Sequence, residues 1–441
     1  MSIENYKFDT LKVRAGYNPE DHNYSVAVPI YQTAAFDLGS PDRAENLFLG
    51  NEEGYLYTRV NNPTVDVLEK RVAALEGASG AIAVASGMAA IAYTILNIAE
   101  GGGRILSSAY IYGAASDSFK RIYPKFGIHF DLSRNFDKPE ELEKEIKPDT
   151  KAIYVESISN PNGDIVDIEA LAELAHKHGI PLVVDNTFAT PYLLNPIKYG
   201  ADVVVYSATK ALNGHGNVIA GLVLESGKFP WDNGNFPQFL EKNYTLRDEN
   251  ENPRNFVEKF PELPFTTRIR LNYLNYLGAA ISPFDAYLLL IGIETLSERI
   301  QKQVSNTKKV IDFLEKNDHV EWIKYPSLET SPYYELSKKY FPLGSGSVFS
   351  FGFLGSLEKI KEFITAVELF SYHANIGDAR SLIINSPKTT HSELTPEEQT
   401  YAEIEPNLIR LSIGLEDPDD LINDLDQAFK QVFLKKNRNF D

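Results

Sequence analysis

The sequence contains no cysteine, which excludes disulfide bridges, thiolate nucleophiles and cysteine-ligated zinc together. It also lacks long apolar runs, since none approaches the roughly 18 residues that a membrane-spanning helix needs. Residues 1–5 are polar and do not show the basic-then-apolar order of a signal peptide. We therefore expect a cytoplasmic protein with no membrane association.

Basic residues are scarce relative to acidic ones. The chain has 43 Lys and Arg against 61 Asp and Glu, a formal net charge of −18. Such a surface repels nucleic acid and anionic lipid, although a local basic pocket can still bind an anion. A small-molecule ligand is therefore the expected partner, and at 441 residues we expect the chain to form two or three packed lobes.

The middle of the chain alternates between helical and strand patterns. Asn62 and Pro63 suit the start of a helix that ends at Gly77. Continuous apolar runs then alternate with amphipathic segments, as in residues 81–85, 104–107, 152–155, 181–185 and 202–206. Continuous rather than alternating apolar strands predict an α/β fold with a mostly parallel central sheet covered by helices on both faces.

The rest of the chain divides around this region. Residues 1–62 show little periodicity and are predicted to form an N-terminal arm. Residues 63–280 form the predicted large domain, in which an irregular insertion covers about 228–270. Long irregular segments inside a compact domain are usually functional or flexible. Residues 281–441 return to helical and strand patterns and are predicted to form a smaller C-terminal αβ domain.

Two polar segments follow neighbouring predicted strands. Asp185 ends one strand, and Ser207, Thr209 and Lys210 follow the next. Open α/β sheets bind ligands at this edge. A lysine there can form an imine with an aldehyde cofactor, the hydroxyls can bind its phosphate, and the acid can keep a pyridinium nitrogen protonated. A surface lysine and a helix-capping aspartate would explain each residue singly, but the combination is specific.

Ser86, Gly87 and Met88 lie at a predicted strand-to-helix turn, where backbone amides can meet a phosphate. This signal is weak alone, because small residues at such turns often serve only tight packing. His215 has no second histidine at ligand spacing, so no metal site is predicted.

The chain resembles the Cys/Met-metabolism family of pyridoxal-phosphate (PLP) enzymes over nearly its whole length, and within that family the O-acetylhomoserine sulfhydrylases (aminocarboxypropyltransferases). The motifs that carry the resemblance lie at residues 8–11, 29–33, 57–64, 184–189, 375–382 and 409–417. The resemblance implies fold type I of the PLP-dependent transferases, as in aspartate aminotransferase. It also implies pyridoxal 5'-phosphate as the cofactor.

Site roles are implied by the same resemblance. Lys210 would form the Schiff base, Asp185 would pair with the pyridinium nitrogen, and Tyr112 would stack on the ring and help proton transfer. The remaining cofactor contacts would be Tyr57, Arg59, Ser86, Gly87, Met88, Asn160, Ser207 and Thr209. Tyr57 and Arg59 would reach the phosphate of a neighbouring subunit, which implies an obligate dimer and, in this family, a homotetramer built as a dimer of dimers. Arg410, Ser381 and Tyr57 would bind the substrate.

The implied reaction is γ-replacement, in which sulfide or methanethiol displaces acetate from O-acetyl-L-homoserine to give homocysteine or methionine. Ala114 and Ala115 stand where methionine-degrading members carry Cys, and Tyr206 and His215-Gly216 depart from the cystathionine-type pattern. Cystathionine γ-synthase, O-succinylhomoserine sulfhydrylase and a methionine or cystathionine γ-lyase remain alternatives. A non-catalytic PLP-binding homologue is a more remote one.

Overall fold

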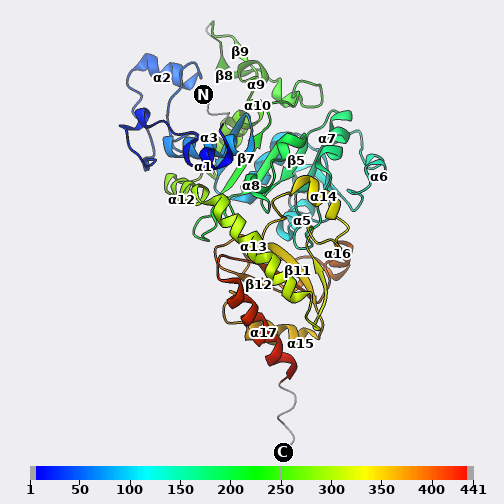
Figure 1. Ribbon diagram of the computed structural model, residues 1–441. Coiled ribbons are helices and arrows are strands. Elements are labelled where there is room, and N and C mark those ends of the chain that lie inside the picture. The colour runs from blue at the N-terminus through cyan, green and yellow to red at the C-terminus, as the bar shows by residue number, and fades with distance from the viewer. Residues whose placement is uncertain (1–5, 249, 435–441) are drawn as a thin grey trace, which may run out of the picture.

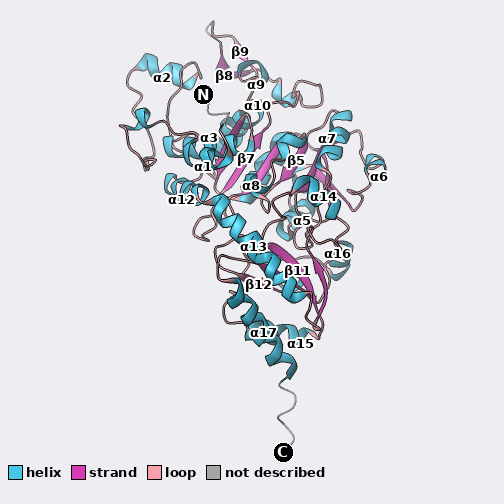
Figure 2. Cartoon of the chain, in the orientation of Figure 1, coloured by secondary structure: helices cyan, strands magenta, loops and turns pink. Residues whose placement is uncertain are grey.

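The computed structural model describes residues 6–248 and 250–434, and two sheets of different kinds organise them (Figure 1, Figure 2). The larger sheet has seven strands in the order β1-β7-β6-β5-β4-β2-β3. These strands are β1 Gly80–Val84, β2 Gly103–Ser108, β3 Ile128–Ser133, β4 Thr150–Glu156, β5 Leu182–Asp185, β6 Val203–Ser207 and β7 Gly221–Glu225. All run parallel except β7, which is antiparallel to β1 and β6. The mostly parallel sheet is as predicted, whereas β3 and β7 were not anticipated.

Both faces of this sheet are buried, as the continuous apolar strands predict. Val183 belongs to one apolar cluster with Val205, and the next residue, Val184, belongs to the other with Val204. The helices of this part of the chain are α3 Pro63–Glu76, α4 Gly87–Ile98, α5 Gly113–Arg121, α6 Pro139–Glu143, α7 Ile168–Lys177 and α8 Thr190–Leu193, with short 3-10 turns at Tyr123–Phe126 and Pro196–Tyr199. Because neighbouring residues of one strand point to opposite faces, each face has a core of its own.

Local signals at the ends of α3 act as the sequence predicts. The Asn62 side chain accepts a hydrogen bond from the backbone N–H of Thr64 at 3.0 Å, and Pro63 occupies the first turn. Gly77 ends the helix in the left-handed region, with φ 72°. Glycine adopts this conformation without the steric cost that a Cβ would add.

The C-terminal part is built on a four-stranded antiparallel sheet in the order β10-β11-β13-β12. Its strands are β10 Val320–Lys324, β11 Val348–Phe353, β12 Leu382–Ile384 and β13 Leu408–Ser412. Its helices are α12 Pro283–Glu294, α13 Leu296–Leu314, α14 Tyr334–Tyr340, α15 Leu357–Ala366, α16 Pro396–Tyr401 and α17 Pro418–Leu434, with a 3-10 turn at Ser386–Lys388. In Figure 1, α15 and α17 lie beyond this sheet, at the end of the molecule away from the larger one. None of the described helices combines the length and apolar character that crossing a bilayer requires.

The predicted arm and insertion contain more regular structure than their composition suggests. Within the arm, α1 Phe8–Arg14 and α2 Pro41–Phe48 are helical, with a 3-10 turn at Pro19–His22. The insertion folds into a 3-10 turn at Pro237–Phe239, β8 Asn243–Arg247, β9 Pro253–Arg254, α9 Phe256–Lys259 and α10 Pro264–Arg268. A π-helical turn η6 Ile269–Leu274 and α11 Asn275–Leu277 then lead to α12. The arm is therefore not uniformly extended. The predicted domain boundaries stay a prediction.

Candidate active site

The predicted cofactor residues converge on the carboxyl edge of the larger sheet. Asp185 ends β5 and Ser207 ends the adjacent parallel strand β6. The turn at Ser86 reaches the same edge through Gly221, which pairs with Val84 on one side and with Ser207 on the other. The tertiary structure thus joins the turn at Ser86 to two turns that lie about a hundred residues or more further along the sequence, after Asp185 and Ser207.

Thr187 links Asp185 to the next strand. Its hydroxyl donates to Asp185 Oδ1 at 2.5 Å and accepts the backbone N–H of Ser207 at 2.8 Å. The Tyr154 hydroxyl donates to Asp185 Oδ2 at 3.3 Å. Burial raises the pKa of Asp185, and the hydrogen bonds from Thr187 and Tyr154 offset part of this effect. A cation beside this carboxylate would favour its charged form.

Lys210 is partly buried, and its Nζ donates to Asn375 Oδ1 at 2.8 Å. Burial, and secondarily the positive charge of Arg410, lowers the pKa of the Lys210 amine to about 8. A larger share of this amine is therefore neutral near pH 7 than of an ordinary lysine. Only the neutral form can attack an aldehyde.

Arg410 lies on β13 of the smaller sheet and is only 3% exposed. It donates to Asn160 Oδ1 at 2.8 Å and to the Asn375 carbonyl at 3.1 Å. Burial lowers the pKa of its guanidinium to about 10. Within residues 6–248 and 250–434 no carboxylate pairs with this guanidinium, so it can donate hydrogen bonds to the carboxylate of a ligand.

The turn after β1 is shaped for close approach to Ser207. Ser86 caps α4 by accepting the Ala89 N–H at 3.1 Å, and Gly87 is the first helical residue. A Cβ on Gly87 would lie 2.6 Å from the Cβ of Ser207, so only glycine fits there. The first amides of α4 and the hydroxyls of Ser86 and Ser207 therefore lie together, as an anion site at a helix N-terminus requires.

Two other predicted cofactor contacts border this turn. Thr209 exchanges hydrogen bonds with the backbone of Ala220, accepting its N–H at 2.9 Å. Met88 is half-buried and packs against the apolar cluster on one face of the sheet. Thr209 lies in the turn after β6, which also carries Lys210.

Tyr112 stands at the start of α5 with 39% of its surface exposed. Its backbone N–H donates to Glu156 Oε1 at 2.7 Å. Burial raises the pKa of its hydroxyl, which keeps the phenol neutral. The backbone is held while the ring stays partly open, which suits a side chain that stacks on a bound ligand.

Glu156 is a site residue that the sequence analysis did not single out. It ends β4 and pairs in register with Asp185 on β5. Its second oxygen accepts the Asn160 N–H at 3.2 Å, so one carboxyl group holds the backbones of both Tyr112 and Asn160. Burial, and then the charge of Asp185, raises its pKa well above the usual range. The available signal was an acid at the end of an apolar strand, the same signal that marks Asp185.

Asn375 and His391 were likewise missed as individual site residues. Asn375 contacts both Lys210 and Arg410. His391 is fully buried, and its Nε2 lies 3.2 Å from the Asn160 carbonyl. Burial, helped by Arg410, lowers the pKa of its imidazole to about 4, so this ring is neutral at pH 7. Asn375 opens the family motif at residues 375–382, which was the available signal for it. Nothing in the local sequence marks His391, because its partner comes from a distant segment.

The hydroxyl of Ser381 is already hydrogen-bonded to other groups of the protein. Its hydroxyl donates to Glu416 Oε2 at 2.8 Å and accepts the Gly414 N–H at 2.8 Å. These bonds tie together the segments that flank β12 and β13. A direct contact of Ser381 with a substrate stays a prediction.

Tyr57 and Arg59 are exposed and stand apart from this hydrogen-bond network. The Arg59 guanidinium carbon lies 4.9 Å from the centre of the Tyr57 ring. Among the described residues, no side-chain hydrogen bond joins either one to the groups around Lys210. The two side chains are thus available to a ligand or to a second subunit.

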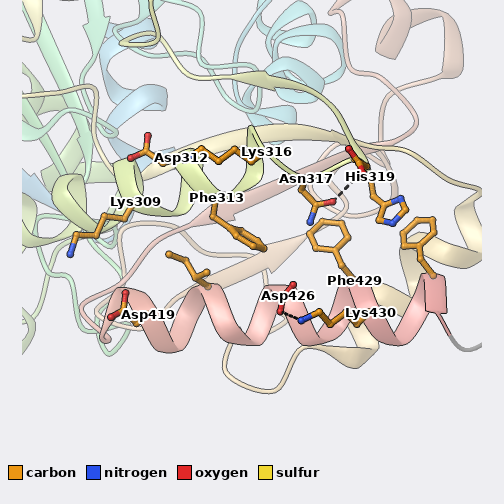
Figure 3. Close-up of a pocket in the computed structure, with 13 residues that line it drawn as sticks. Lys309, Asp312, Phe313, Lys316, Asn317, His319, Asp419, Asp426, Phe429 and Lys430 are labelled. Atoms are coloured by element: carbon orange, nitrogen blue, oxygen red, sulfur yellow. Dashed lines mark hydrogen bonds and ion pairs between the residues drawn. The ribbon is translucent and has the colours of Figure 1, made fainter.

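A pocket elsewhere in the molecule is chemically mixed (Figure 3). It has a volume of about 690 Å³ and lies between α13 and α17. Aromatic side chains such as Phe429 line it beside both lysines and aspartates, and Lys430 pairs with Asp426 at 2.5 Å. None of the predicted site residues lines this pocket.

Comparison with known proteins agrees with this arrangement. The family described as Cys/Met metabolism PLP-dependent enzyme matches residues 9–430. The chain belongs to this family. An O-acetyl-L-homoserine sulfhydrylase of Leptospira meyeri is 43% identical over 437 residues, which are 97% of this chain and 98% of the relative. A homocysteine synthase of Schizosaccharomyces pombe is 41% identical over 98% of this chain and 100% of its own.

A solved structure is similar along the same length. It is a putative O-acetylhomoserine (thiol)-lyase of Campylobacter jejuni, described with a pyridoxyl-lysine monophosphate. It is 38% identical with a TM-score of 0.91, and the match covers 96% of this chain and 100% of the other. The predicted family, fold class, enzyme class and cofactor are confirmed.

The residues of this chain fit pyridoxal 5'-phosphate. Asp185 supplies a carboxylate acceptor, Lys210 supplies an amine of lowered pKa, and the close approach of Gly87 to Ser207 brings the start of α4 beside the Ser207 hydroxyl, where a phosphate can be bound. This donor set matches the three chemical features of the cofactor: its ring nitrogen, its aldehyde and its phosphate.

Proposed function

We propose that this enzyme catalyses γ-replacement on O-acetyl-L-homoserine, with sulfide or methanethiol as the incoming group. The products would be acetate and either homocysteine or methionine. The observation that carries the proposal is the position of Asn375 between two functional groups: it accepts from Lys210 Nζ at 2.8 Å through its side chain and from Arg410 at 3.1 Å through its carbonyl. The Lys210 amine and a buried guanidinium that has no carboxylate partner among the described residues lie close together. This arrangement suits an α-amino acid, whose carboxylate the guanidinium would bind.

Pyridoxal phosphate, when bound, supplies a cationic ring that makes the hydrogens of Cα and then Cβ acidic. Asp185 would keep the ring nitrogen protonated. Arg410 would orient the substrate by its carboxylate, and the Lys210 amine, once released, would move protons between Cα, Cβ and Cγ. Tyr112 would fix the plane of the ring and assist the proton transfer. Ser86, Ser207 and Thr209 would hold the phosphate.

Other members of the family would use the same cofactor residues. Cystathionine γ-synthase, an O-succinylhomoserine sulfhydrylase and a methionine or cystathionine γ-lyase therefore remain alternatives. The relatives named as sulfhydrylase and homocysteine synthase support the acetylhomoserine assignment. A non-catalytic homologue is disfavoured because it would have no need to keep Lys210, Asp185, Tyr112 and Arg410 together.

Product analysis tests the proposal. The purified protein is incubated with O-acetyl- or O-succinyl-L-homoserine and, in turn, with sulfide, methanethiol or L-cysteine. We expect homocysteine or methionine from the acetyl ester, with little cystathionine. Dominant formation of cystathionine, or of 2-oxobutanoate without any added thiol, would replace this proposal with one of the alternatives.

Assembly and location remain proposals. We infer a homotetramer built from dimers, because Tyr57 and Arg59 are exposed here and would complete the site of another subunit. We also propose a cytoplasmic location, which is supported by the composition alone. Light scattering measures the assembly directly.

A further inference from the structure

The loop of residues 51–60, which carries Tyr57 and Arg59, is hydrogen-bonded near its beginning to the insertion. Lys259, the last residue of α9, donates through Nζ to the side chain of Asn51 at 2.8 Å. The same Nζ donates to the Arg247 carbonyl on β8, also at 2.8 Å. Figure 1 shows α2 of the arm and the β8-β9 hairpin at the same end of the molecule.

The end of the same loop is held by a second residue of the insertion. Arg270 donates to the carbonyl of Val60, directly after Arg59, at 2.8 Å. Its guanidinium also forms an ion pair with buried Glu69 of α3 at 2.6 Å. Glu69 in turn accepts the N–H of Ala83 on β1 at 2.8 Å. The end of the loop is therefore anchored to both a core helix and the central sheet.

Between these two anchors the loop has its own internal ties. The Asn61 side chain donates to the Gly54 carbonyl at 2.7 Å and accepts the Leu56 N–H at 3.3 Å. The backbone N–H of Thr58 donates to the Ala34 carbonyl at 2.9 Å. The backbone is thus constrained, while the side chains of Tyr57 and Arg59 are exposed and contact each other.

We propose that Lys259 and Arg270 form a clasp that positions Tyr57 and Arg59 for the cofactor phosphate of a neighbouring subunit. This rests on the proposed function and on the predicted exchange of the arm between subunits. Lys259 and Arg270 are positioning residues. By ordering the loop before it meets its ligand, they reduce the entropy lost on binding. The insertion is then part of the cofactor site, although it contacts no cofactor itself.

The first experiment measures cofactor affinity and loop order in Arg270→Met. Arg268→Met is the control, because Arg268 lies two residues earlier in the same segment and bonds to Asn97 at 2.6 Å without touching the loop. We expect the dissociation constant for pyridoxal phosphate, measured by fluorescence titration of the apoprotein, to rise about tenfold in Arg270→Met, as the loss of an oriented charged contact implies. Amide hydrogen exchange over residues 51–60 should be faster than in the control.

Lys259→Ala provides a second variant with little risk to folding. We expect a smaller rise in the same dissociation constant, about threefold, since its contact with Asn51 is exposed to water. Lys242→Ala is its control, because Lys242 pairs only with Glu258 inside the insertion, at 2.5 Å. That variant should bind the cofactor like the unmodified protein.

Mixed oligomers test whether the clasp acts on the cofactor site of its own subunit or on that of a neighbouring subunit. In one pairing a Lys210→Ala subunit joins an Arg270→Met subunit, so the single competent lysine receives an intact loop. In the other pairing one subunit carries both substitutions and the second is unmodified, so the competent lysine receives the altered loop. Cofactor trapped on Lys210 by borohydride at limiting concentration should be near normal in the first pairing and reduced in the second.

Any of three results would overturn the clasp. Arg270→Met could bind the cofactor no more weakly than Arg268→Met, or hydrogen exchange over residues 51–60 could be unchanged. The third result is reduced trapping in the first pairing, where Lys210 and the Arg270→Met substitution belong to the same subunit. Normal binding by both the unmodified protein and Arg270→Met would remove the clasp alone. An unmodified protein that captured no pyridoxal phosphate would instead refute the proposed function, and the clasp with it.

Discussion

Lys210 and Arg410 meet at Asn375, and their surroundings are buried strands and their connecting turns. Tyr57 and Arg59, by contrast, project from a loop that is anchored near both ends, at Asn51 and Val60. The first group is organised by the folding of one subunit. In the second group, the Arg59 guanidinium lies over the Tyr57 ring, and within the described part of the chain neither side chain bonds to the groups around Lys210. One chain thus brings together the amine, the acid and a phosphate-binding turn of its own, and on the proposed function Tyr57 and Arg59 would add phosphate contacts to the site of another copy.

Lys210→Ala, which changes the first of these two groups, should produce the largest effect. We expect turnover to be abolished, because neither covalent capture of the cofactor nor the proton transfers can occur without this amine. The visible absorbance of the covalently bound cofactor should disappear. Turnover and absorbance are compared with Lys177→Ala, which changes a surface lysine paired with Glu143. Full activity in the Lys210 variant would contradict its assignment.

Arg410→Lys should have the next largest effect. Lysine cannot make the two-pronged contact of a guanidinium with a carboxylate, so kcat/KM for the amino acid should fall about 100-fold. Cofactor affinity should change little, which separates substrate binding from cofactor binding. Arg380→Lys, on an exposed residue paired with Asp378 at 3.0 Å, is the control. Equal losses in the two variants would count against a specific role.

Arg59→Ala changes the second group, the exposed pair Tyr57 and Arg59. It should weaken cofactor affinity about tenfold, as expected for one lost charged contact to a phosphate. Because this side chain is exposed and makes no side-chain hydrogen bond within the described chain, the melting temperature of the apoprotein should stay unchanged. Exposed Arg14→Ala is the matched control. A large fall in melting temperature would show that Arg59 stabilises its own subunit instead.

The pH dependence of cofactor capture should give the smallest change. With a lowered pKa of about 8, Lys210 is neutral above that pH and protonated below it. The rate at which the apoprotein captures pyridoxal phosphate should therefore rise only about fourfold between pH 7.5 and 9 and then level off, whereas a lysine of ordinary pKa would keep rising. Stopped-flow absorbance measures the rate. A continued rise beyond pH 9.5 would show that burial does not lower this pKa.

Much of the fold followed from local patterns. The boundaries of α3 depend on Asn62, Pro63 and Gly77, each of which acts through its own backbone conformation or side chain. The buried parallel strands follow from apolar runs such as residues 181–185. Strand β7 was missed because its antiparallel pairing with β1 and β6 depends on the whole sheet.

By itself the sequence determined which residues could supply the chemistry: an amine, an acid and small hydroxyl residues at strand ends, together with an arginine and a tyrosine identified by resemblance. Only the tertiary structure decided which groups support them. Glu156 holds the backbones of Tyr112 and Asn160, and Asn375 joins Lys210 to Arg410. The physical reason is that strand ends are local features, whereas hydrogen bonds between distant segments exist only once the two sheets have packed together.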